Sequence, residues 1–204
     1  MTFIAFLVAA LALALTPGPG LAYVIARTAA GGRAEGLASC FGTAIGGLLH
    51  VLAAALGLSL VIARSAVAFN VLKYLGAAYL VYLGVRMLLR RQVSTVEPVA
   101  SHGARRALLE GIAVEILNVK TALFFLAFLP QFVSPSEPLV PQLVLLGVIS
   151  VTLNTAVDIL AVLGAHRALR SDTARAAREL LMTRVSGVTM VGLGAFVAIA
   201  RRET

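Results

Sequence analysis

Long apolar runs separated by short polar stretches make up almost the whole sequence. A run of about 20 apolar residues is long enough to cross the hydrocarbon core of a bilayer as one helix. The pattern therefore predicts an all-α polytopic membrane protein with about six transmembrane spans; the alternative is five spans, with the short last run outside the membrane. The expected spans are Thr2–Ala26, Leu37–Ile62, Ala66–Leu89, Ala107–Leu129, Leu139–Ala165 and Val185–Ala200.

The two halves of the chain echo each other in the positions of their small and polar residues. Gly84 and Gly194 are 110 residues apart, and His50 and Asp158 are 108 apart. TPGPG in the first span precedes NVK in the fourth by 102 residues. Because each half holds three spans, an odd number, a duplication places the second half upside down, as in transporters built from inverted repeats. We expect one transporter domain, with repeat one at about 1–89, a cytoplasmic linker at about 90–106 and repeat two at about 107–204.

The motif TPGPG interrupts the first span near its middle. Pro17 and Pro19 cannot donate backbone hydrogen bonds, and Gly18 and Gly20 weaken a helix. One proline is enough for a kink. The doubled motif instead favours a true break, which exposes the Thr16 hydroxyl, backbone groups and a half-helix end to a cavity. A plain kink is the alternative.

The fourth span carries three polar residues near its centre, Glu115, Asn118 and Lys120. A lysine at membrane depth is costly and is expected to face a partner or a wet cavity. Lys120 is therefore expected to hold a substrate carboxylate, to form an ion pair with Asp158 or Glu115, or to do both. Asn118 can bond freed backbone groups or a substrate, and it shares a helix face with Glu115.

The fifth span has a polar stripe, because Ser150, Asn154 and Asp158 recur every four residues. Such a stripe is expected to face the bundle interior. Asp158 is the best candidate for a proton carrier, with a fixed counter-ion to Lys120 as the alternative. Glu115 and His50 are further proton-coupling candidates, although a single histidine in an apolar span is as often a packing residue.

Composition supports the membrane assignment and narrows the function. The chain is 60% hydrophobic and 13% charged, with a mean hydropathy of +0.97, whereas soluble domains are about half apolar and about a quarter charged. The net charge of +8 comes from basic residues clustered between apolar runs, which is typical of membrane loops rather than of nucleic-acid binding. The single Cys40 excludes a disulfide framework. Without a metal-ligand cluster, a phosphate-binding loop or a nucleophile motif, we expect no enzyme activity, metal site or cofactor.

The distribution of arginine predicts the orientation in the bilayer. With six spans, the first, third and fifth loops share one side and hold twelve arginines, against three on the opposite side. The positive-inside rule then places these loops in the cytoplasm and both chain termini outside. With five spans, the C-terminus would be cytoplasmic.

Four segments follow one another in the first four spans: TPGPG, GTAIGGLLH, KYLGAAYLVYLG and NVKTALFFLAFLPQFV. In this order they resemble the LysE/RhtB family of bacterial amino-acid exporters over nearly the whole chain. The last segment, from Asn118 to Phe132, is the most specific. The family usually has Asn-Pro-Lys there, and this chain has Val119 in place of the proline, which predicts a weaker break in the fourth span than in the first.

This resemblance implies export of an amino acid or a derivative across the bacterial inner membrane, driven by the proton gradient as an antiport. Asp158 resembles the acidic residue that many members carry in the fifth span. In the expected mechanism, Lys120 and a half-helix end near TPGPG hold the substrate carboxylate while Asp158 cycles its proton. The substrate-binding residues implied are Thr16, Pro17, Gly18, Pro19, Gly20, Asn118, Lys120 and Gln131, with Pro130 beside the last.

Two other function classes stay open. An ion or metal exporter or channel of related architecture would show no amino-acid counterflow and little proton coupling. A non-transporting scaffold would tolerate joint apolar replacement of Lys120 and Asp158, since pairing would be their only role. The depth of these residues and the broken span argue against a scaffold. The sequence leaves the substrate and the formation of a homodimer open.

Overall fold

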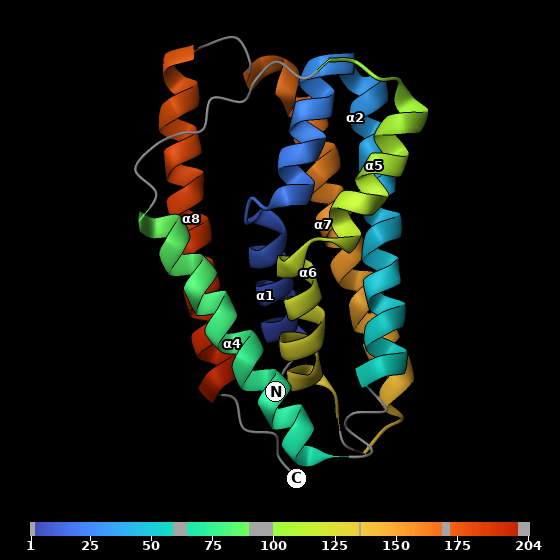
Figure 1. Cartoon of the computed structure of the whole chain (residues 1–204), viewed down its shortest axis with the longest axis vertical. Helices are drawn as coiled ribbons and strands as arrows, with labels where there is room; N and C mark the ends of the chain where they lie inside the picture. The colour runs from blue at the N-terminus through green and yellow to red at the C-terminus, as the bar shows by residue number, and fades with distance from the viewer. Residues whose placement is uncertain (1–2, 59–64, 90–99, 135, 169–171, 200–204) are drawn as a thin grey trace.

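A computed structural model describes residues 3–58, 65–89, 100–134, 136–168 and 172–199, and every regular element in this part of the chain is helical (Figure 1). Helices satisfy their backbone polar groups internally, as a bilayer requires. The prediction of an all-α polytopic membrane protein is confirmed. The elements are α1 (Phe3–Leu15), α2 (Pro19–Ala53), η1 (Ala54–Leu58), α4 (Ala66–Leu89), α5 (Ala104–Ile116), α6 (Val119–Leu123), η2 (Phe124–Phe128), η3 (Leu129–Phe132), α7 (Leu139–Ala168) and α8 (Asp172–Ile199).

Helix α2 consists of two arms that run in opposite directions. Gly31 (φ −121°, ψ 15°) and Gly32 (φ 70°, ψ −161°) interrupt it, and the positive φ of Gly32 belongs to the region that favours glycine. The first arm continues the direction of α1, and the second arm returns beside it (Figure 1). The loop predicted at Arg27–Gly36 is therefore a tight turn between two helices.

The described residues run along the bundle in six segments. The first joins α1 to the first arm of α2, the second is the other arm with η1, and the fourth joins α5 to α6, η2 and η3. The remaining three are α4, α7 and α8. Among the described residues, three helices are long and apolar enough to cross a membrane, and one bent pair makes a fourth. They are Val67–Leu89, Leu139–Gly164, the pair Ala104–Ile116 with Val119–Phe132, and Pro19–Gly57, which this count takes whole across its turn at Gly31 and Gly32.

The last segment differs in length from the prediction. Helix α8 begins at Asp172 rather than near Val185, because the charged stretch between them is rich in alanine, arginine, glutamate and leucine, which are strong helix formers. It packs along α4 (Figure 1), so the last apolar run belongs to the bundle. The predicted turn near Arg64 and residues 90–99 of the predicted linker lie outside the described residues.

The contact between α4 and α8 repeats itself with an offset of 110 residues. A Cβ atom on Gly84 would lie 2.6 Å from the carbonyl oxygen of Gly187, and one on Gly194 would lie 2.7 Å from the carbonyl oxygen of Ala77. Gly194 and Gly187 each follow their counterparts Gly84 and Ala77 by 110 residues. An inverted repeat would produce such an exchange of equivalent contacts between antiparallel helices, and the division of the chain into two repeats stays a prediction.

Small residues also bring the second arm of α2 against α5. A Cβ atom on Gly42 would overlap the carbonyl oxygen of Leu108 and lie 3.1 Å from Gly111 Cα. One on Gly111 would lie 2.9 Å from the carbonyl oxygen of Ser39. Such glycines let two membrane helices approach to backbone contact. This contact brings the second segment alongside the first half of the fourth.

The core lies around the second half of the fourth segment. Phenylalanine rings from four elements pack together there: Phe128 and Phe132 have centroids 4.9 Å apart, and Phe6 and Phe196 contact this pair at 5.7 and 5.5 Å. Many large apolar side chains elsewhere are exposed on the outside of the bundle. In a membrane protein these outer side chains face lipid.

A buried carboxylate ties residues 101–103 to the turn of α2. The Oε1 atom of Glu35 accepts hydrogen bonds from the Ser101 hydroxyl and from the backbone nitrogens of residues 102 and 103, at 3.0 and 2.7 Å. Its Oε2 atom pairs with Arg27 Nη1 at 3.4 Å. Both side chains of this pair are buried. The residues just before α5 are thus attached to the first half of the chain.

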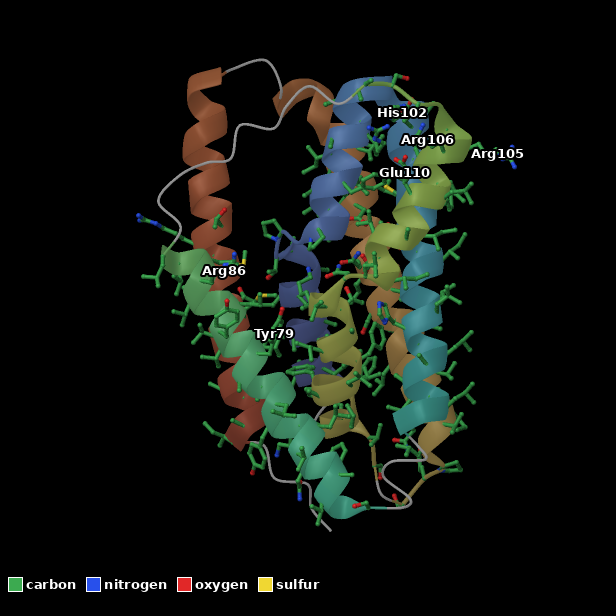
Figure 2. All side chains as sticks on the ribbon, viewed as in Figure 1. Tyr79, Arg86, His102, Arg105, Arg106 and Glu110 are labelled. Atoms are coloured by element: carbon green, nitrogen blue, oxygen red, sulfur yellow. The ribbon has the colours of Figure 1, made fainter. Side chains whose placement is uncertain are left out.

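Charged side chains gather at the same end of the bundle. Figure 2 shows His102, Arg105, Arg106 and Glu110 around the first turns of α5. Arg106 Nε lies 2.7 Å from Glu110 Oε1, and the Tyr23 hydroxyl donates to Glu110 Oε2 at 3.1 Å. This is the end that the positive-inside rule assigns to the cytoplasm, and we call it the linker end.

Candidate functional site

The first segment is broken at TPGPG. Three residues separate the end of α1 from the start of α2, and the Thr16 hydroxyl turns back to donate to the Ala12 carbonyl at 2.7 Å. Gly18, in an extended conformation, is the N-cap of α2. Pro19 takes the first helical position, where a missing N–H leaves no helical hydrogen bond unmade. The predicted break is confirmed in preference to a plain kink.

The fourth segment is broken without a proline. Asn118 is the N-cap of α6, and its side-chain oxygen accepts a hydrogen bond from the Lys120 backbone nitrogen at 3.2 Å. Val119 takes the first helical position that proline holds in the family pattern. The two parts of the segment are bent by 46°. The interruption covers two residues against three at TPGPG, so the capping asparagine is sufficient for a shorter break.

Lys120 connects the two breaks. Its Nζ atom donates to the carbonyl oxygens of Thr16 at 2.8 Å and Leu13 at 3.3 Å, and the side chain is 7% exposed. The last carbonyls of a helix lack intrahelical partners and carry partial negative charge, so an ammonium group stabilises them. The ion pair predicted with Asp158 or Glu115 is not formed within 4.0 Å among the described residues. The backbone of α1 holds this charge instead.

Glu115 lies at the other side of the first break. Its carboxylate accepts hydrogen bonds from Asn118 Nδ2 at 3.0 Å and from Thr121 Oγ1 at 2.6 Å, and it is 3% exposed. A Cβ atom on Gly20 would lie 2.6 Å from its Oε2 atom. Gly20 belongs to the first turn of α2, where the helix dipole favours an anion. The fourth segment therefore places a cation against one end of the first break and an anion against the other.

Asp158 faces the same region from α7. Its Oδ2 atom accepts hydrogen bonds from Thr43 Oγ1 at 3.3 Å and from Asn154 Nδ2 at 3.4 Å, and it is 1% exposed. Ser150 is also buried, and its hydroxyl donates to the Leu146 carbonyl at 2.9 Å. The polar stripe of the fifth span thus faces the bundle interior, as predicted.

A small cavity lies between the breaks and α7. Its volume is about 20 Å³, which is room for one water molecule and too little for an amino acid. The site is closed in this structure, so a substrate can enter only when the segments separate. The polar residues that line the cavity are Thr43, Glu115, Thr121, Ser150, Asn154 and Thr155.

Two predicted site residues have other surroundings. His50 Nε2 donates to the Glu115 carbonyl oxygen at 2.9 Å, and its ring stacks on Phe125 with centroids 6.3 Å apart, so it caps the end of α5. Gln131 Nε2 donates to the Ala127 carbonyl at 3.2 Å. The 13 residues between Asn118 and Gln131 correspond to roughly 20 Å of helix, so Gln131 and its neighbour Pro130 lie away from the breaks.

The structure adds residues that the sequence did not indicate. Thr43 and Thr121 donate to Asp158 and Glu115. Thr43 lies on the same helical stripe as His50, and this spacing could have marked it as a site residue. No sequence feature marks Thr121, because threonine is common on packed faces of membrane helices.

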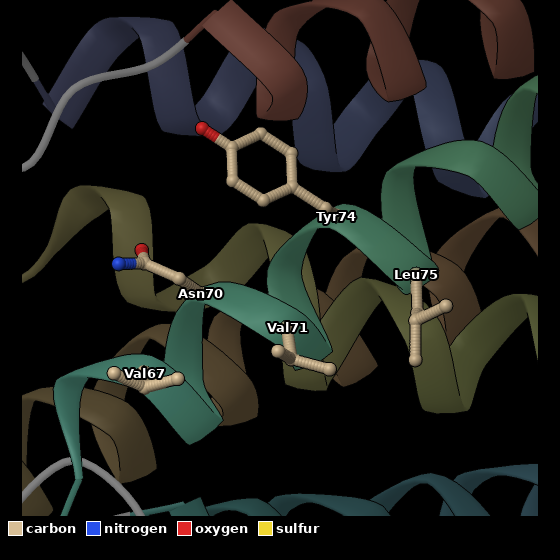
Figure 3. A pocket seen from close by; sticks show the side chains of 5 residues that line it. All are labelled: Val67, Asn70, Val71, Tyr74 and Leu75. Atoms are coloured by element: carbon tan, nitrogen blue, oxygen red, sulfur yellow. The ribbon is translucent and has the colours of Figure 1, made fainter.

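A shallow hollow of about 430 Å³ lies on the outer face of α4. Figure 3 shows its five lining side chains, Val67, Asn70, Val71, Tyr74 and Leu75, all from that one helix. Its lining is mostly apolar, and it gathers no polar groups from a second element. The hollow belongs to the outer surface rather than to the site at the breaks.

Replacing Asn118 tests the second break. Asn118→Ala removes the N-cap of α6 and one hydrogen bond to Glu115, and we expect a loss of about 1 kcal/mol in the free energy of unfolding. Asn118→Ser keeps an acceptor at the cap and should recover much of that loss. Thermal unfolding of the purified proteins in detergent measures both. Equal stability of the alanine and serine variants would show that the cap is unimportant.

Comparison with known proteins identifies relatives along most of the chain. The family described as LysE type translocators matches residues 11–201. An uncharacterized membrane protein of Vibrio cholerae serotype O1 is 30% identical over 204 residues, which cover 98% of this chain and 97% of the relative. No solved structure matches the chain.

Two relatives carry functional names. The homoserine/homoserine lactone efflux protein of Salmonella typhimurium is 31% identical over 161 residues, covering 77% of this chain and 78% of the relative. The leucine efflux protein of the same organism is 32% identical over 139 residues, covering 65% and 64%. The matched ranges are long enough to include several of the segments described above.

Proposed function

The chain belongs to the LysE type translocator family, and from this premise we propose that it exports an amino acid or an amino-acid derivative in exchange for protons. The observation that carries the proposal is the pairing of the two helix breaks through Lys120. The names of the homoserine and leucine efflux relatives indicate the substrate class. The family consists of translocators, so the chain is not assigned an enzymatic reaction.

The substrate carboxylate would bind at Lys120. An ammonium group has three N–H donors, and two of them are directed at the carbonyls of Leu13 and Thr16. The third is available for a charge-assisted hydrogen bond to a carboxylate oxygen. A Cβ atom on Gly18 would lie 3.0 Å from Nζ, so a side chain at this position would displace the ammonium, and glycine leaves it in place. The backbone of residues 16–20 and the side chain of Asn118 complete this site.

Asp158 would carry the exchanged proton. Its two hydrogen bonds are long, 3.3 and 3.4 Å, and neither donor is a cation. Glu115 is held by shorter bonds to two donors, and its carboxylate lies against the N-terminal turn of α2, where the helix dipole favours a negative charge. His50 is occupied with the carbonyl of residue 115. Of the three proton-coupling candidates, Asp158 has the longest hydrogen bonds, so it can change its partners and its protonation state most easily.

Transport requires the closed cavity to open alternately to each side of a bacterial inner membrane. The linker end carries the concentration of arginines, so it would face the cytoplasm and both termini would lie outside. Separation of α5 from the turn of α2 would open the cytoplasmic side, because the contacts of Glu35 and Tyr23 close that end. Rocking of one repeat against the other around a fixed site is the usual motion of such transporters.

Purified protein in liposomes tests the proposal. Vesicles loaded with unlabelled homoserine or leucine should take up the labelled amino acid by counterflow, and an acid interior should drive uptake without a preload. Empty vesicles are the control. Uptake of ions without amino-acid counterflow would identify a channel or ion exporter. No flux of either kind, across a panel of amino acids and derivatives, would favour a scaffold.

Lys120→Met tests the binding role. The variant keeps an unbranched side chain one atom shorter than lysine but loses the charge, so we expect export to fall to the level of empty vesicles while the protein still inserts into the membrane. Lys73→Met makes the same chemical change in α4 and should retain export. Normal counterflow by Lys120→Met would make the lysine merely structural.

A further inference from the structure

The open end of α1 is a cation site. We propose that it would accept a small monovalent cation such as Na⁺ or K⁺, that the Lys120 ammonium fills it permanently, and that export therefore needs neither ion. The site consists of the carbonyl oxygens of Leu13 and Thr16, both directed at Lys120 Nζ. This inference uses the proposed export function only for its transport measurement.

At the C-terminal end of α1, backbone carbonyl oxygens surround the Lys120 ammonium as they would surround a bound cation. The last four carbonyls of a helix have no intrahelical donors. Here the Thr16 hydroxyl donates a hydrogen bond to the Ala12 carbonyl at 2.7 Å, and the Thr16 backbone N–H donates one to the Leu13 carbonyl at 3.1 Å. Lys120 Nζ supplies the formal positive charge, 2.8 Å from the Thr16 oxygen. Removing the ammonium would leave buried oxygens at the negative end of a helix dipole.

Transporters with broken helices use such ends for their coupling ions. Unwound carbonyls and the C-terminal ends of half-helices coordinate Na⁺ or protons there. An ammonium group has the same charge as Na⁺ or K⁺, and carbonyl oxygens bind all three. Because Lys120 is attached to the protein, its ammonium occupies the site in every conformation that keeps this contact. The ion whose gradient drives export then has to bind at another group.

The surroundings restrict the site to one small cation. A methyl group on Gly18 would lie 3.0 Å from both Nζ and Cε of Lys120, so Gly18 bounds the site on one side. Lys120 forms no ion pair within 4.0 Å with Glu115 or Asp158 in the described part of the chain. The backbone oxygens are therefore its direct partners, and the carboxylates are more distant charges.

Cation titration of the unfolding temperature tests the site directly. Lys120→Ala leaves space and open carbonyls, and we expect NaCl, KCl or methylammonium chloride to raise its unfolding temperature by about 5 °C or more at 100 times the Kd, relative to choline chloride at equal ionic strength. Wild-type protein should unfold at the same temperature in all four salts. Lys120→Met is the matched control, because its apolar side chain fills the space, and it should show no cation effect.

The outcomes separate the cation site from the proposed function. A Lys120→Ala protein that folds but shows no cation-specific stabilisation overturns the site, as does a wild type that requires Na⁺ or K⁺ for export. If Lys120→Ala yields no folded protein, Lys120→Ser carries the same titration, since its short side chain also leaves the carbonyls of Leu13 and Thr16 open. Failure of wild-type counterflow overturns the export function but leaves the unfolding measurement valid. Export by Lys120→Ala is expected to return in the stabilising cation.

Discussion

Gly42→Ala should destabilise the folded protein by about 1–3 kcal/mol, the usual cost of forcing extra atoms into a packed core. The new methyl group would overlap the carbonyl oxygen of Leu108 and lie 3.1 Å from Gly111 Cα. Both contacts are with backbone, so no side-chain rotation can relieve them. The second arm of α2, which carries Thr43, and α5, which carries Glu115, would have to separate.

Gly192→Ala is the matched control. Gly192 lies on an exposed face of α8, where a Cβ atom would meet nothing within 4 Å among the described residues. Helix propensity alone predicts that both alanine variants gain stability. The packing argument predicts a loss at residue 42 only, so the sign of the change in unfolding temperature decides between them. Equal gains in both variants would contradict the close approach of α2 and α5.

Asp158→Asn is expected to uncouple export from the proton gradient. One pH unit across the membrane can support about a tenfold accumulation of substrate for each proton exchanged. In liposomes with an acid interior, wild-type protein should approach that accumulation, whereas the asparagine variant should only equilibrate its substrate. Counterflow needs no net proton movement and should survive, since asparagine keeps the shape and the polar contacts of the site.

Glu137→Gln controls for the change from acid to amide. Glu137 is exposed in the turn before α7, far along the chain from the breaks, and its variant should keep both accumulation and counterflow. Full proton-driven accumulation by Asp158→Asn would show that a residue other than Asp158 carries the exchanged proton. Loss of counterflow as well would mean that Asp158 contacts the substrate.

The all-helical polytopic fold was accessible from the sequence because it depends on the length of the apolar runs. The offset of 110 residues between Gly84 and Gly194 reappears in the α4–α8 contact. The break at TPGPG was also predictable, since proline removes a hydrogen-bond donor wherever it is placed. The break at Asn118 was harder to judge, because an asparagine caps a helix only when its side chain turns back on the backbone.

The partner of Lys120 could not be read from the sequence. Charge complementarity suggested Asp158 or Glu115, but the ammonium group binds backbone oxygens, and every residue has such an oxygen. The burial of Arg27 and Glu35 could not be predicted from the sequence either. Both belong to a basic stretch that looks like a solvated loop, and only the turn at Gly31 and Gly32 brings them together.

The reach of Lys120 has a consequence for biosynthesis. The lysine follows Thr16 by 104 residues, so the ribosome completes α1 and the rest of the first half of the chain long before Lys120 exists. Until then the end of α1 has no ammonium to neutralise it inside the bilayer. Each half of the chain, expressed alone, should therefore be degraded quickly, and the two halves expressed together should protect each other.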